Sequence, residues 1–90
     1  MEYADRIRRK LTEALAPERL DVVDESGRHA GHAGARPEGE THFHVTVVSA
    51  AFAGRSRIER QRMVYGLLAE EMAERIHALG LTTLTPDEAR

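Results

Sequence analysis

Five histidines stand out among the residues that could do chemistry in this chain of 90 residues. The chain has no cysteine, so thiolate ligands are excluded and the histidine imidazoles are its main candidates for binding a transition metal. They form two close pairs and one single position: His29, His32, His42, His44 and His77. A structural zinc site has four ligands and usually includes cysteine, so four histidines with no cysteine and no carboxylate at fixed spacing would be unusual. A self-contained zinc site is therefore the weaker interpretation of these residues.

The spacing of the histidines leaves alternatives open. His42 and His44, two apart in an alternating segment, would share one face of a strand, where both could meet one ion or simply face solvent. His29 and His32 fall in the segment from Gly27 to Thr41, which is rich in glycine and alanine and is either a binding loop or a slack connection. His77 follows the main predicted helix and is expected to be exposed. It is either available to bind a partner or a surface residue without a function.

Arginines gather before and within the first turns of that helix, giving Arg55 to Arg62 a local charge of +3 (four arginines and one glutamate). Arginines next to the amides of a helix N-terminus can bind phosphate, as in a nucleic acid backbone. The alternative is a solvated helix start whose arginines pair with acidic neighbours. No aromatic residues are interleaved for base stacking. The candidate nucleic-acid residues are Gly54, Arg55, Ser56, Arg57, Arg60 and Arg62.

Composition narrows the class of protein. The net charge of -2 does not favour binding to DNA or an acidic membrane by charge alone. No apolar run has the length of a signal peptide or a membrane span, so we expect a cytoplasmic protein without a membrane partner. No G-x-S-x-G, P-loop or H-E-x-x-H motif is present, so we expect no enzymatic activity.

The first half of the chain contains the pattern of one helix and two strands. Residues 3 to 15 place Ile7, Leu11 and Leu15 on one helical stripe that Pro17 should end. Leu20 to Asp24 is short and β-branched, and the alternation around Phe43 predicts a second strand with one buried face.

The second half predicts a long helix, a strand and a short helix. Ser56 and Glu59 form a capping box at the start of a helix over residues 57 to 76. Its predicted core face contains Ile58, Val64, Tyr65, Leu68, Ala69, Met72, Ala73 and Ile76. Leu81 to Leu84 is β-prone, and Thr85 to Glu88 combines an N-cap, a proline and a second capping box. We expect one α+β domain over residues 1–90, with a three-stranded mixed sheet, helices on one face and the order α-β-β-α-β-α.

Several segments, in this order, resemble the BolA family. They are Val23-Asp24-Glu25-Ser26, Glu40-Thr41-His42-Phe43, Phe52-Ala53-Gly54-Arg55-Ser56-Arg57 and Ile76-His77-Ala78-Leu79. The resemblance implies a class II KH-like fold and a partnership with monothiol glutaredoxins of the CGFS type. In such pairs a [2Fe-2S] cluster is shared with the glutaredoxin, which brings glutathione, and the isolated chain holds none. The implied ligands here are His77 and a loop histidine, either His29 or its alternative His32.

The resemblance also implies a second role, transcriptional regulation through contact with DNA. The turn at Gly54 and the helix after it would make this contact through the arginines named above. The family commonly has arginine, histidine and arginine after this turn, whereas this chain has Gln61 in the middle position. A role for a histidine there is lost. Alone, the chain is expected to be a monomer or a weak homodimer.

Overall fold

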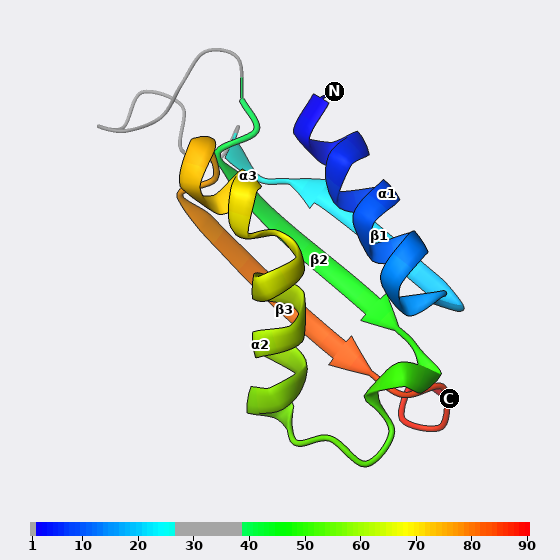
Figure 1. Ribbon diagram of the computed structural model, residues 1–90. Coiled ribbons are helices and arrows are strands. Elements are labelled where there is room, and N and C mark those ends of the chain that lie inside the picture. Colours follow the sequence, from blue (N-terminus) through cyan, green and yellow to red (C-terminus); the bar gives the residue numbers. More distant parts are fainter. Residues whose placement is uncertain (1, 27–38) are drawn as a thin grey trace.

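The computed structural model describes residues 2–26 and 39–90. Its elements are α1 (Glu2–Leu15), β1 (Arg19–Asp24), β2 (His42–Val48), the 3-10 helix η2 (Ala50–Phe52), α2 (Arg57–Leu67), α3 (Ala69–Glu74) and β3 (Ala78–Leu84). The strands form one sheet in the order β1-β2-β3, antiparallel between β1 and β2 and parallel between β2 and β3. The helices cover one face of this sheet, as Figure 1 shows. The three-stranded mixed sheet of an α+β domain is therefore confirmed.

The local patterns of the first half give the expected elements. Ile7, Leu11 and Leu15 are buried on α1, which ends before Pro17. Phe43 and Val45 point into the core from β2, while His42 and His44 lie on the half-exposed opposite face. The core consists of Ala4, Ile7, Leu11, Leu15, Phe43, Val45, Val47, Phe52, Val64, Leu68, Ile76 and Leu79. His42, His44 and His77 therefore lie outside this apolar core.

The single helix expected over residues 57 to 76 is wrong, because the chain breaks it at Leu68 into α2 and α3. The buried face of α2 and α3 also contains different residues from the predicted core face. Val64, Leu68 and Ile76 are buried as expected, but Ile58 is 61% exposed and Ala69 and Ala73 are exposed. The physical reason is Glu71, a fully buried carboxylate in the middle of the true core face, which an apolar pattern leaves out.

The last helix of the expected order is also wrong. The predicted reciprocal bonds do form, from the Thr85 amide to Glu88 Oε1 (2.8 Å) and from the Glu88 amide to Thr85 Oγ1 (3.3 Å). They close only a turn, with a single helical bond from the Ala89 amide to the Thr85 carbonyl. A capping box satisfies amides at a helix start but does not by itself extend a helix. The observed order is α-β-β-α-α-β, with η2 after β2.

Candidate functional site

His77 lies in the tight turn between α3 and β3, where its side chain is exposed. Two backbone bonds end α3, from the amides of Arg75 and Ile76 to the Glu71 carbonyl, each 3.0 Å. The His77 amide then donates to the Thr41 carbonyl at 2.7 Å, at the start of β2. The backbone of His77 is therefore held from both sides while its imidazole faces outward.

His42 lies beside His77, a neighbour that the sequence analysis missed. The two ring centroids are 6.0 Å apart at an interplanar angle of 64°. The parallel register between β2 and β3 produces this contact, because it pairs His42 with Ala78, the residue after His77. His42 Nδ1 is 2.9 Å from Thr41 Oγ1. This bond orients the His42 ring next to the exposed imidazole.

His44 has different neighbours from His42, although both point to the same face of β2. Its Nε2 is 3.0 Å from Thr82 Oγ1. Its ring also covers Gly80, where an added Cβ would lie 2.8 Å from His44 Nδ1. Among residues 2–26 and 39–90 there is no group of three or more histidines, aspartates or glutamates that could hold a metal ion. The structure thus brings His42 toward His77, and His44 is packed against β3.

His29 and His32, the predicted loop ligands, lie outside the described residues, but the described residues that flank their segment are well fixed. Asp24 accepts hydrogen bonds from the amide and the hydroxyl of Ser26, and from the Glu40 amide at 3.0 Å. Burial alone would raise the pKa of Asp24, but these bonds and the nearby His42 hold it below its usual value. Asp24 therefore fastens both ends of the segment to β1.

The far end of that segment also contacts the helices. Arg75 Nη2 donates to the Gly39 carbonyl at 2.6 Å, directly before the His77 turn. Glu40 Oε2 accepts from the amides of Tyr3 and Ala4, at 3.0 and 3.1 Å, and caps the start of α1. The described residues on either side of positions 27–38 are thus fixed close to the turn that carries His77.

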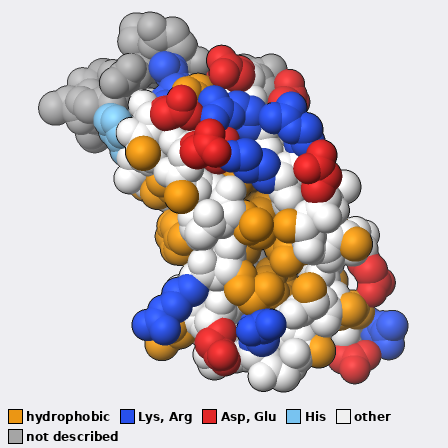
Figure 2. Space-filling view, viewed as in Figure 1, with side chains coloured by type: hydrophobic (Ala, Val, Ile, Leu, Met, Phe, Trp, Pro, Cys, Tyr) orange, Lys and Arg blue, Asp and Glu red, His pale blue; other side chains and the backbone are white. Residues whose placement is uncertain are grey.

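A buried ion cluster holds α3 against α1. Glu71 is fully buried, and its carboxylate accepts from Arg6 Nε at 2.8 Å and from Lys10 Nζ at 3.0 Å. Arg6 also reaches Glu74 Oε1 at 2.7 Å. Burial raises the pKa of Glu71, but the bonds from Lys10 and Arg6 outweigh it and the net shift is downward. Acidic and basic side chains cover α1 and α3 in Figure 2.

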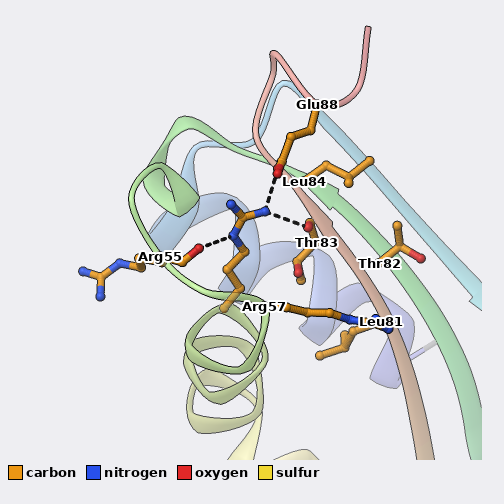
Figure 3. Close-up of a pocket in the computed structure, with 8 residues that line it drawn as sticks. Arg55, Arg57, Leu81, Thr82, Thr83, Leu84 and Glu88 are labelled. Atoms are coloured by element: carbon orange, nitrogen blue, oxygen red, sulfur yellow. Dashed lines mark hydrogen bonds and ion pairs between the residues drawn. The ribbon is translucent and has the colours of Figure 1, made fainter.

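The turn at Gly54 and its arginines lie near the Leu84 end of β3, whereas His42 and His77 lie at the Ala78 end. Gly54 has a positive φ of 77°, and Ser56 and Glu59 form the predicted capping box at the start of α2. Arg55, Arg57 and Arg62 are exposed. With residues 81–84, Arg60 and Glu88, the first two line an open pocket of about 480 Å³ (Figure 3).

Arg60 is bound within the fold, which the charge pattern did not reveal. Its Nε donates to the Arg55 carbonyl at 3.0 Å, and its Nη1 donates to the Thr83 carbonyl at 3.1 Å and to Glu88 at 2.6 Å. The Arg60 hydrogen bond is the first of several that lower the pKa of Glu88 to about 2. Arg60 therefore fastens the turn after β3 and offers less of its charge to a ligand than Arg55 and Arg57 do.

The geometry defines an α+β domain with an exposed histidine at one end of its edge strand and an arginine-lined pocket at the other. The family model BolA, described as BolA-like protein, matches residues 11–88. The chain belongs to the BolA family. No helix in the described part of the chain is long and apolar enough to cross a membrane.

Relatives and solved structures agree with this assignment. Human BolA-like protein 1 is 48% identical over 84 residues, which cover 93% of this chain and 58% of the human protein. SufE-like protein 1, chloroplastic/mitochondrial, of Arabidopsis thaliana is 46% identical over 87 residues, covering 92% of this chain and 24% of that protein. The BolA domain of SufE1 from Arabidopsis thaliana superposes with a TM-score of 0.88 at 43% identity, covering 98% and 96% of the two chains. The chain thus spans a quarter to just over half of these two relatives, and no enzymatic family is indicated.

Proposed function

We propose that this chain is a non-enzymatic, cytoplasmic partner of a monothiol glutaredoxin of the CGFS type and helps to ligate a bridging [2Fe-2S] cluster. Its role would lie in cluster trafficking or iron homeostasis. The observation that carries the proposal is the exposed His77, on a fixed turn beside both anchored ends of the segment that contains His29 and His32. The chain itself would act as one domain.

The donor set fits such a cluster. A chain without cysteine cannot offer iron a thiolate, and neutral imidazole replaces thiolate in Rieske-type centres. A bound cluster would supply one-electron redox chemistry at a potential that histidine ligation raises. His77 would provide one nitrogen, and the His42 ring next to it would restrict the orientation of the His77 ring. Outer contacts of this kind commonly orient metal-binding histidines.

Chain length favours His29 over His32 as the second ligand. His29 follows the anchored Ser26 by three residues, so their Cα atoms are at most about 11 Å apart. His32 is six residues from Ser26, within about 22 Å, and must order more chain to reach the same place. His29 is therefore the first choice, and His32 is the alternative loop ligand.

Reconstitution with a CGFS glutaredoxin tests this function. The chain, the glutaredoxin, glutathione, iron and sulfide are combined anaerobically, and the complex is isolated by size exclusion with its visible spectrum recorded. We expect a heterocomplex whose spectrum differs from that of the glutaredoxin alone. His29→Ala should change the spectrum and weaken the complex, while His32→Ala should change neither.

The matched control for these variants is His44→Ala, which removes an imidazole bound to Thr82 on the sheet. It should behave as the unmodified chain does. A reversed result, with His32→Ala damaging and His29→Ala silent, exchanges the two loop ligands. Absence of any heterocomplex with a cluster would contradict the proposed function itself.

The second candidate function is regulation of transcription through DNA binding. It goes with the class II KH-like fold that the family resemblance implies. The exposure of Arg55, Arg57 and Arg62 at the start of α2 supports it. We expect duplex DNA to bind weakly, with an affinity that falls steeply with salt because the contacts are to phosphates. Arg57→Ala should reduce both the affinity and the salt dependence in a mobility-shift titration, whereas Arg8→Ala on α1 should not. An affinity insensitive to salt would rule out phosphate contact.

A further inference from the structure

The strand β3 is an edge of the sheet whose own sequence lacks the residues that usually protect an edge. It pairs only with β2 in the described sheet. Its residues, Ala78–Leu84, include no charged residue and no proline. The opposite edge, β1, has Arg19, Asp21 and Asp24. Proteins commonly place charges, prolines or covering elements on edge strands to prevent added pairing, so the two edges differ in what they permit.

The outward backbone groups of β3 can be identified from its bonds to β2. The Ala78 amide donates to the Thr41 carbonyl, and the Leu84 carbonyl accepts from the Ser49 amide. The backbone amides and carbonyls of the even-numbered residues therefore point toward β2. By alternation, the backbone groups of Leu79, Leu81 and Thr83 point away from the sheet. Side chains of α2 already bind two of these carbonyls.

Those two bonds leave the middle of the edge open. Tyr65 Oη donates to the Leu79 carbonyl at 2.6 Å, and Arg60 Nη1 donates to the Thr83 carbonyl at 3.1 Å. Between them, the Leu81 amide and carbonyl have no hydrogen-bond partner outside the sheet among residues 2–26 and 39–90. An extended peptide needs one such donor and acceptor pair to begin a new strand.

Apolar and positive side chains surround this open position. Ile58 and Tyr65 are 61% and 39% exposed and are seven apart, so they share one side of α2. The Tyr65 bond to Leu79 shows that this side borders the edge of β3. Arg57 extends toward Leu81 in Figure 3, and Arg55 lies on the rim of the same pocket. Figure 2 shows basic and hydrophobic side chains together at this lower end.

We propose that the β3 edge binds an extended acidic peptide segment of a partner protein as a fourth strand. The peptide backbone pairs with Leu81, an apolar side chain packs on Ile58 and Tyr65, and a carboxylate binds Arg57. A second copy of this chain fits less well, because a two-fold pairing at Leu81 would bring the same arginines together. A nucleic acid would leave the apolar side of α2 uncovered.

This surface is independent of the proposed cluster function. His42 and His77 lie at the Ala78 end of β3, and the pocket lies at the Leu84 end. Both can therefore be occupied at the same time. The peptide site can be tested without iron or glutaredoxin.

The test uses the full chain labelled with ¹⁵N and a capped peptide in which valine and glutamate take turns at every second position, with threonine between them, so that both side chains can face α2. Binding should shift the amide signals of Leu81 and Thr83 and slow hydrogen exchange at both by at least about tenfold, as a new ladder bond requires. The same peptide with lysine in place of glutamate should not bind. Equal binding of the two peptides, or unchanged exchange at Leu81, would overturn the proposal.

Single substitutions test which side chains contact the peptide. Arg57→Glu and Ile58→Lys should each weaken peptide binding by about tenfold, corresponding to about 1.4 kcal/mol. Both side chains are exposed, so the circular dichroism spectrum should not change. Arg8→Glu, the same charge change on α1, should bind as the unmodified chain does. Protection of Leu81 by duplex DNA, or a dimer pairing through β3 without peptide, would show a different occupant and overturn the proposal.

Discussion

Replacing Glu71 with glutamine is expected to lower the free energy of unfolding by about 3 kcal/mol. The carboxylate is fully buried, and Lys10 Nζ and Arg6 Nη2 lie 2.9 and 2.7 Å from Oε2. Glutamine keeps the size of the side chain but removes the charge that both cations need, and its amide group adds a donor among donors. Urea unfolding followed by circular dichroism measures the change.

Glu70→Gln is the matched control for this prediction. Glu70 is the neighbouring residue, its side chain is 77% exposed, and it lies 3.7 Å from Lys10 and 4.0 Å from Arg6. Exposed pairs of this kind contribute little, so the change should stay within about 0.5 kcal/mol. Equal losses for the two variants would mean that burial of the Glu71 carboxylate has no special importance.

The same residue predicts a dependence of stability on pH. Lys10 and Arg6 hold the pKa of Glu71 below its ordinary value of 4.5. A carboxylate with a lowered pKa in the folded state stabilises the fold above the unfolded pKa, and this contribution is lost as the pH falls through the folded pKa. The difference in stability between the unmodified chain and Glu71→Gln should therefore be constant above about pH 5.5 and shrink below pH 4.5. A difference that does not change down to pH 3 would contradict the ion cluster.

The second large effect is expected for His77→Ala, which should reduce the yield of cluster-bound heterocomplex by at least about tenfold. Loss of outer-shell partners alone typically costs 10- to 100-fold in metal affinity, and loss of a ligand costs at least as much. The fold should tolerate the change because the side chain is exposed and the bond from residue 77 to Thr41 is made by the backbone. The measurement is the visible absorbance per heterocomplex after anaerobic reconstitution.

Two controls make that loss interpretable. His44→Ala removes an imidazole from the same sheet and should retain the cluster, since its ring is bound to Thr82. The unfolding midpoint of His77→Ala without iron should match that of the unmodified chain. A full yield of cluster with His77→Ala would remove this residue from the ligand set.

Local sequence patterns correctly predicted α1, β2 and the start of α2. The stripe of Ile7, Leu11 and Leu15 predicted α1, and the alternation around Phe43 predicted β2 with its histidines on the half-exposed face. Ser56 and Glu59 predicted the start of α2 at the correct residue. Each of these signals compares neighbours within a few residues, which is the range over which helix and strand periods act.

The errors share a different cause, which is contact between distant residues. Glu71 is buried only because α1 brings Arg6 and Lys10 to it, so a pattern that treats glutamate as exposed misplaced the core face of α2 and α3. His42 meets His77 through the parallel register of β2 and β3, which spacing along the chain does not encode. Arg60 looked equivalent to Arg57 until its bonds to Thr83 and Glu88 were visible.

Donation of an imidazole nitrogen from this chain to iron is the central claim, and electron paramagnetic resonance tests it directly. The chain is labelled with ¹⁵N-histidine, combined with unlabelled glutaredoxin and glutathione, and the reconstituted complex is reduced. Pulsed spectra should show strong ¹⁵N couplings from directly bound histidine, and His77→Ala should lose one of them. A reduced cluster in the heterocomplex without strong histidine coupling would contradict the proposed function.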